Sequence, residues 1–334
     1  MLLARYLSLC LTLIISAAAQ TQSSVSPDNL GDGASTFRIT SELVLVDVQV
    51  LHAKTGTPAP LLNSSDLILS EEGVPQQITL FSRDEFPLSV VLLFDLTDSV
   101  HSVLKHLADG ARMALNHFKP DDEIAVIVYS GGATLVDGFT RDREQTLAAI
   151  GKAAKMTSHQ PAYFNEGVYQ AAMQLRKAAS PSNRSVIIWL TDNFPNVPFH
   201  KMDWPVHTEI EAFRALHEEN VVVAPILMKS ALYMMIEPMI SATEAPWRKA
   251  YPPGDAKKYA ELTGGQAVGM RGKQPEERLA QLIDELRARY TIGYRPSDPG
   301  PAGAFRKISV QLAPSSTLRA KEWKVLARQG YYRK

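Results

Sequence analysis

Short apolar runs alternate with stretches of helical periodicity between residues 87 and 289, and this alternation is the strongest constraint on the fold. The apolar runs are rich in β-branched residues, which is typical of strands buried on both faces. Strand and helix in alternation predict an α/β domain with a doubly wound, mainly parallel sheet of six strands. The expected strands are 89–94, 124–129, 135–139, 185–190, 221–227 and 266–268, and the expected helices are 99–117, 142–155, 165–178, 209–218, 255–263 and 275–289. Segment 135–139 follows its predecessor too closely for a crossover helix, so we expect it to pair antiparallel.

The two ends of the chain show a different pattern, with short alternating segments bounded by turns. These segments are 37–51, 66–70 and 77–81 near the start, and 290–294, 306–312 and 325–332 near the end. Such segments are typical of β-strands. We expect the two ends to pair as one small β-sandwich into which the α/β domain is inserted. The alternative is a separate β cap at each end.

The amino terminus has the features of a secretory signal. Arg5 precedes an apolar stretch, 7–15, and Ala17-Ala18-Ala19 follows as a cleavage site. Cleavage after Ala19 predicts a secreted or periplasmic protein, and an uncleaved anchor is the alternative. The expected organisation is therefore a signal peptide (1–19), a flexible leader (20–35), a first sandwich part (36–86), the α/β domain (87–289) and a second sandwich part (290–334).

Charge and cysteine content exclude several classes of function. Lys and Arg (35) balance Asp and Glu (35), so the sequence offers no basic surface for nucleic acid. No segment after the signal approaches the roughly 20 apolar residues of a membrane span. The single cysteine, Cys10, lies inside the signal, so we expect the mature protein to have neither thiolate metal sites nor thiol catalysis.

Oxygen-bearing side chains follow two of the expected strands. Asp95, Thr97 and Ser99 come directly after the strand at 89–94, and Thr191 and Asp192 come after the strand at 185–190. The carboxyl ends of parallel strands meet at one edge of a sheet, so we expect the two groups to face each other. Carboxylate and hydroxyl oxygens are the ligands of Mg²⁺ or Mn²⁺. The alternative is that Asp95 and Thr97 only cap the following helix.

These loops resemble the metal-ion-dependent adhesion site of the von Willebrand factor type A domain. The flanking segments Leu45-Val46-Asp47-Val48, Tyr290-Thr291-Ile292-Gly293-Tyr294 and Gly330-Tyr331-Tyr332 extend the similarity to secreted bacterial von Willebrand factor A-related proteins found in acidobacteria. The resemblance covers nearly all of the mature chain. It implies that Asp95, Thr97, Ser99 and Asp192 are metal ligands.

The second loop departs from the family pattern. Family members usually have Gly-Gly-Thr before the helix that is expected here at 165–178, and the threonine supplies a ligand. This chain has Gln160-Pro161-Ala162 instead. Thr157, Ser158, Tyr163 or water would have to fill the position of Ala162, and the consequence is a weaker metal site or an absent one.

The resemblance implies a binding protein and not an enzyme. The cation would keep an open position for an acidic group of a protein or cell-surface partner, as in cell adhesion. A degenerate, metal-free interaction module is the first alternative. A less favoured one is a phosphotransferase of the haloacid dehalogenase type with Asp95 as nucleophile, although such loops normally have glycine where Asp98 stands. The segment 228–253 combines methionines and aromatic residues, which indicates either an adaptable partner surface or a loop packed on its own sheet.

Overall fold

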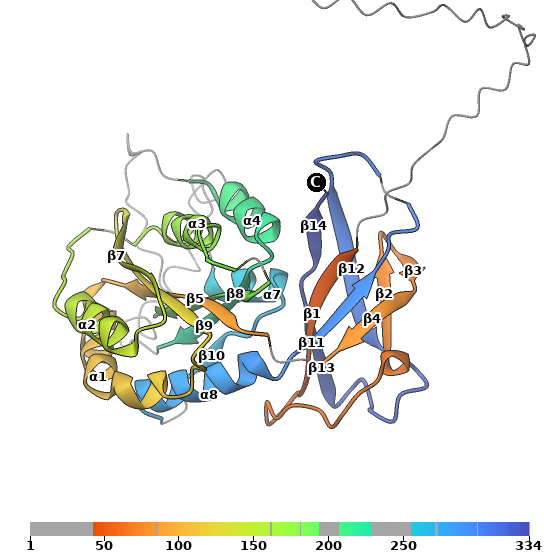
Figure 1. Cartoon of the computed structure of the whole chain (residues 1–334), viewed down its shortest axis with the longest axis horizontal. Coiled ribbons are helices and arrows are strands. Elements are labelled where there is room, and N and C mark those ends of the chain that lie inside the picture. Colours follow the sequence, from red (N-terminus) through yellow and green to blue (C-terminus); the bar gives the residue numbers. More distant parts are fainter. Residues whose placement is uncertain are drawn as a thin grey trace, which may run out of the picture. The chain divides into compact units, whose positions relative to one another are not determined.

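Three β-sheets organise the protein (Figure 1). The structure is a computed structural model that describes residues 43–83, 86–160, 162–180, 182–193, 207–228, 255–270, 273–298 and 300–333. The expected signal peptide, the leader and most of the segment 228–253 lie outside these ranges. In the ranges described, no helix combines the length and the apolar character needed to cross a membrane.

The central sheet has six strands in the order β10-β9-β8-β5-β6-β7. They are β5 (Leu88–Asp95), β6 (Glu123–Tyr129), β7 (Ala133–Thr140), β8 (Arg184–Thr191), β9 (Val222–Leu227) and β10 (Val268–Gly269). β5 is buried along its whole length and pairs in parallel with β6 and β8. β7 is the antiparallel strand, paired with β6. The mainly parallel six-stranded sheet expected from the sequence is confirmed.

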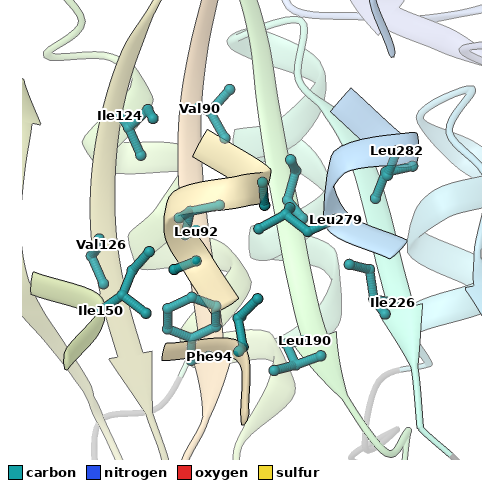
Figure 2. Close-up of a cluster of buried hydrophobic side chains, with 14 of the residues drawn as sticks. Val90, Leu92, Phe94, Ile124, Val126, Ile150, Leu190, Ile226, Leu279 and Leu282 are labelled. Carbon is teal, nitrogen blue, oxygen red and sulfur yellow. The ribbon is translucent and has the colours of Figure 1, made fainter. Parts of the chain in front are cut away.

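Helices cover both faces of this sheet (Figure 1). One face carries α1 (Asp98–Leu115), α2 (Arg143–Ala153) and α8 (Pro275–Arg287), and the other carries α3 (Phe164–Leu175), α4 (Glu209–Glu218) and α7 (Ala256–Leu262). Alternate residues of β5 supply the two cores because successive side chains of a strand point to opposite faces. Val90, Leu92 and Phe94 lie in the first core, as Figure 2 shows, whereas Val91 and Leu93 lie in the second.

The remaining strands form two antiparallel sheets of four. One has the order β13-β1-β11-β4 and the other β14-β12-β2-β3. Their bounds are β1 (Val44–His52), β2 (Leu67–Glu71), β3 (Val74–Gln76), β4 (Ile78–Ser82), β11 (Tyr290–Tyr294), β12 (Phe305–Leu312), β13 (Trp323–Ala327) and β14 (Gly330–Tyr332), with a short 3₁₀ turn (Ser64–Asp66) before β2. Both sheets contribute to one apolar core that includes Val46, Leu69, Ile292 and Ile308. Strands from the two ends of the chain therefore pair, as the sandwich interpretation expects.

The chain passes between sandwich and α/β domain at two neighbouring strands. It leaves from β4 into β5 and returns from α8 into β11, and β4 and β11 pair with Ser82 opposite Thr291. Arg184 at the start of β8 forms an ion pair with Asp47 of β1 at 3.2 Å, and both side chains are almost buried. This ion pair links the first strand of the sandwich to the central sheet.

Some of the expected strands differ from those observed. The expected strand 325–332 is two strands in different sheets, β13 and β14, because the chain crosses from one sheet to the other at Arg328 and Gln329. β3, which the sequence analysis did not include, holds Pro75 at a sheet edge, where a missing N–H is tolerated. β1 begins at Val44, and the earlier part of the expected strand 37–51 lies outside the described residues.

Candidate metal centre

The first oxygen-bearing loop links β5 to α1. Asp95 is the last residue of β5 and is fully buried. Its Oδ1 accepts a hydrogen bond from the backbone N–H of Thr97 at 2.9 Å. Thr97 is the N-cap residue of α1, yet its side chain makes no capping hydrogen bond, and its hydroxyl lies 3.2 Å from that of Ser99. The side chains of this loop are thus turned toward one another and do not cap the helix.

The third loop meets the first across the sheet edge. Asp192 follows β8, and its Oδ2 accepts a hydrogen bond from the Ser99 hydroxyl at 2.6 Å although the two residues are 93 positions apart. Thr191 donates its hydroxyl to Asp95 Oδ2 at 3.2 Å. The structure therefore brings together the four residues expected to be metal ligands, Asp95, Thr97, Ser99 and Asp192.

Burial raises the pKa of the Asp95 carboxyl group. Desolvation raises its pKa from 3.8 to about 6, and the negative charge of Asp192 adds to this effect, whereas hydrogen bonds from Thr97 and Tyr129 oppose it. A carboxylate that is buried next to another acidic group is stabilised in its charged form by a nearby cation. The electrostatics of the edge therefore suit a positive ion between the two loops.

An aromatic pair behind Asp95 was missed by the sequence analysis. The Tyr129 hydroxyl donates to Asp95 Oδ2 at 3.0 Å and accepts from Trp189 Nε1 at 2.9 Å. Burial raises the pKa of Tyr129 well above its ordinary value, so this phenol stays protonated and remains a donor. The Tyr129 ring has room because residue 167 is glycine: a Cβ at Gly167 would lie 2.7 Å from the ring. Tyr129 and Trp189 lie on expected strands, where the sequence pattern predicts only a place in the apolar core.

We expect Tyr129→Phe to lower the free energy of unfolding by about 1–2 kcal/mol. The change removes one buried donor to Asp95 and leaves Trp189 Nε1 without its acceptor, which costs roughly that amount for buried groups. Urea unfolding at pH 8, where Asp95 is ionised, measures the effect. Equal stability of variant and wild type would show that the phenol does not support the carboxylate.

Asn193 fixes the third loop from its other side. Its backbone adopts a left-handed conformation, with φ of 58°, which asparagine tolerates better than most residues. The side-chain Nδ2 donates to Asp255 Oδ1 at 3.1 Å, and Oδ1 accepts from the N–H of Ala256 at 2.8 Å. Because Asn193 directly follows Asp192, these two hydrogen bonds attach the third loop to the start of α7. In the sequence, the indication that a residue fixes this loop is the asparagine directly after Asp192.

The second loop brings a methyl group where the family pattern has a hydroxyl. Ala162 is 1% exposed and packs in the same buried cluster as Tyr129 and Phe164. Ser158 uses its hydroxyl within its own loop, accepting from the N–H of Gln160 at 3.1 Å. Tyr163 is the N-cap residue of α3, and its N–H donates to the Ser130 carbonyl. Any metal here would therefore depend mainly on the first and third loops and on water.

The donor chemistry of the edge fits a hard cation. In the described part of the chain, no group of three or more His, Cys, Asp or Glu side chains is arranged to hold a metal ion. The candidate site consists instead of two carboxylates and two hydroxyls, which is an all-oxygen set. Mg²⁺ and Mn²⁺ accept such a set and retain water at the remaining positions.

Comparison with known proteins gives one family match and several similar folds. Residues 90–194 match the family model described as the von Willebrand factor type A domain. No curated protein matches the chain. Among solved structures, BatB from Bacteroides thetaiotaomicron is 14% identical over 60% of this chain and 97% of its own, with a TM-score of 0.42. The SpRpn10 VWA domain is 12% identical over 60% of this chain and 95% of its own, with a TM-score of 0.36.

Proximal thread matrix protein 1 from the mussel byssus, in a structure with a zinc-occupied MIDAS motif, is also similar. It is 15% identical over 65% of this chain, with a TM-score of 0.41, and the match spans 49% of its length. The part of the present chain that matches the family model contains most of β5, the loop with Asp95, Thr97 and Ser99, and the loop with Asp192. Residues 90–194 of this chain, which carry both loops, are thus similar to the von Willebrand factor type A domain.

Proposed function

We propose that this chain is a secreted, non-enzymatic interaction module that binds a protein or cell-surface partner through a divalent cation at Asp95, Thr97, Ser99 and Asp192. The observation that carries the proposal is the 2.6 Å hydrogen bond between Ser99 and Asp192, which joins the two loops beside the buried Asp95. Secretion is supported by the signal-like amino terminus, in which Ala17-Ala18-Ala19 offers a cleavage site.

The residues at this edge of the sheet have different roles in the proposed cation binding. Asp95 and Asp192 supply negative charge, and the hydroxyls of Thr97 and Ser99 supply neutral oxygen ligands. Tyr129 and Thr191 hold the Asp95 carboxylate in place, and Asn193 holds the loop that carries Asp192. When bound, Mg²⁺ or Mn²⁺ would offer an open coordination position to an acidic group of the partner.

The contacts of Asp95 favour binding over phosphoryl transfer. A nucleophilic aspartate needs a carboxylate oxygen that a substrate can reach, whereas a metal ligand needs only one lone pair directed at the ion. Asp95 is fully buried, its Oδ1 accepts from Thr97, and its Oδ2 accepts from both Tyr129 and Thr191. These contacts fit a carboxylate held in place as a ligand better than one that attacks a phosphate.

Titration calorimetry on the mature protein tests the cation. We expect Mg²⁺ and Mn²⁺ to bind, and we expect partner binding to be lost in EDTA and restored by either metal. If neither metal produces heat while a partner still binds, the protein is a metal-free interaction module whose loops are held together by the Ser99 and Asp192 hydrogen bond. That result would remove the cation from the proposal.

Ala162→Thr is expected to tighten Mg²⁺ binding about tenfold. The change restores the hydroxyl that the second loop of the family normally supplies, and one further ligand replaces a water. Ala162→Val is the matched control because valine has nearly the same shape and no hydroxyl. If valine strengthens binding as much as threonine, the gain comes from packing in the buried cluster and not from ligation.

A further inference from the structure

A groove runs between β12 and β13, where the sandwich is open on one side. Because β13 pairs with β1 and β14 pairs with β12, the chain moves from one sheet to the other between these strands. β12 and β13 lie close at one end, where the Ile308 N–H donates to the Gln329 carbonyl at 2.9 Å. The groove between them has a volume of about 420 Å³ and is lined by residues that include Ile308, Val310, Lys324, Val325 and Ala327.

The β13 wall offers unpaired backbone groups. β13 is an edge strand whose ladder partner is β1, with Trp323 opposite His52. The Ala53 N–H donates to the Glu322 carbonyl at 2.7 Å, so Ala53 and Glu322 form a hydrogen-bonded pair. From Glu322 onward, every second residue is hydrogen-bonded to β1. Lys324 and Leu326 therefore turn their backbone groups toward β1. Trp323 and Val325 turn theirs away from β1, on the free side of this edge strand.

The β12 wall offers unpaired groups by the same reasoning. The Ala313 N–H donates to the Asp66 carbonyl, and the Glu72 N–H donates to the Lys307 carbonyl, so odd-numbered residues of β12 face β2. Even-numbered residues then face the side of β14, the strand that the chain enters from β13 through Arg328 and Gln329. The Ile308 N–H on this side donates to the Gln329 carbonyl. Val310 is the next residue of β12 whose backbone groups point to the same side. Within the described ranges, no strand pairs with Val310 or Val325 from the groove.

The groove has an apolar floor and a mainly positive rim. Ile308 is buried, and Val310, Val325 and Ala327 are half-buried members of the sandwich core. Lys307 and Lys324 are exposed at the rim, and Glu261 is the one acidic residue of the lining. Arg328 also lines the groove; its Nη2 donates to the Leu45 carbonyl, and its buried Nε has no hydrogen-bond partner among the residues described. Three cationic side chains against one carboxylate favour an acidic occupant.

We propose that this groove binds an extended acidic peptide segment of a partner protein, which adds as a strand to the free edge of β13. Backbone hydrogen bonds to Trp323 and Val325 would hold the segment, as in other cases of strand addition to a sheet edge. Its small apolar side chains would cover Val310 and Val325, and its acidic side chains would face Lys307 and Lys324. This site is separate from the cation edge and does not depend on the function proposed above.

A fluorescein-labelled peptide, Glu-Val-Asp-Val-Glu-Val, serves as the probe in an anisotropy titration of the full mature chain. Val325→Pro removes the N–H that faces the groove and leaves the ladder to β1 intact, since proline is tolerated at such positions of an edge strand. We expect this variant to bind the probe about tenfold more weakly, the effect of losing roughly one well-made hydrogen bond. Val325→Thr, which keeps the N–H, is the matched control and should bind as wild type does.

Two further measurements do not depend on the folding of the proline variant. A probe methylated on every backbone nitrogen keeps its side-chain charge but has no N–H group to donate to the edge of β13, so we expect it to bind poorly to wild-type protein. The double variant Lys307→Glu and Lys324→Glu changes only exposed side chains, and it should bind the original probe at least about tenfold more weakly, most clearly at low salt.

The outcomes separate strand addition from its alternatives. If the methylated probe and the Val325→Pro variant both bind normally while the double variant does not, the groove is only a cationic surface and strand addition is wrong. If EDTA or Asp192→Ala abolishes probe binding, the acidic peptide binds at the cation edge instead, and the groove proposal fails. Binding of Lys-Val-Lys-Val-Lys-Val as tight as that of the acidic probe would also overturn it.

Discussion

Asp95→Asn is expected to weaken Mg²⁺ binding by more than about 100-fold while the protein stays folded. Loss of partners outside the first coordination shell already costs roughly 10–100-fold in metal affinity, and Asp95 is proposed as a direct, charged ligand. Asparagine has nearly the same shape and keeps one oxygen to accept from Thr97, or from Tyr129 and Thr191. Calorimetry with Mg²⁺ and Mn²⁺, alongside circular dichroism of the variant, measures both parts of this expectation.

Asp98 provides the matched control for charge in the same loop. Asp98 is exposed and starts α1, whereas Asp95 is fully buried. Asp98→Asn should therefore weaken metal binding only a few-fold, through loss of a screened surface charge. Asp192→Asn should resemble Asp95→Asn. Equal effects of the Asp95 and Asp98 variants would mean that general charge, and not a defined site, attracts the cation.

The metal-free protein is expected to lose stability as the pH rises from 4 to 7. Burial raises the pKa of Asp95 to about 6 from 3.8, so in this range the folded protein holds a proton that the unfolded chain has released. The stabilising contribution is complete below about pH 4 and is lost as the pH passes through 6. The gap between the two pKa values corresponds to roughly 3 kcal/mol in the free energy of unfolding.

Saturating Mg²⁺ should remove this loss or reverse it, because the cation binds the ionised carboxylate and only the folded state forms the site. Urea unfolding between pH 4 and 7.5, with and without Mg²⁺, measures both curves. His217 contributes in the opposite direction, since burial lowers its pKa to about 4. The relevant quantity is therefore the difference between wild type and Asp95→Asn, which cancels groups that both proteins share. A difference that does not change with pH would contradict the assignment to Asp95.

The central sheet could be predicted from sequence because its strands carry strong one-dimensional signals. β5 and β8 are continuous apolar runs, and their polar ends mark the sheet edge where ligand loops collect. The observed α4 has the expected bounds, and its capping box at Thr208 and Glu211 shows why the helix starts where it does. Local chemistry of this kind needs no knowledge of distant contacts.

Features that depend on packing between distant segments could not be predicted. Whether Tyr129 is a core residue or a hydrogen-bond donor to Asp95 is decided by Gly167 and Trp189, which lie on other elements. The expected strand 325–332 showed continuous alternation, and its division into β13 and β14 arises from the change of sheet at Arg328. The sequence pattern is the same whether a strand stays in one sheet or passes between two.

The attachment of the α/β domain at β4 and β11 has a mechanical consequence. These antiparallel neighbours connect to the domain at the same end, where Ser82 lies opposite Thr291. A pull on the α/β domain would reach both strands at that end and in the same direction, so it would not separate β4 from β11 but would load the bonds between this pair and the rest of the sheet. β11 is also bonded to β1 on its other side, with Tyr290 opposite Val48. Under traction, the ladder between β11 and β1 therefore carries the load to the rest of this sheet.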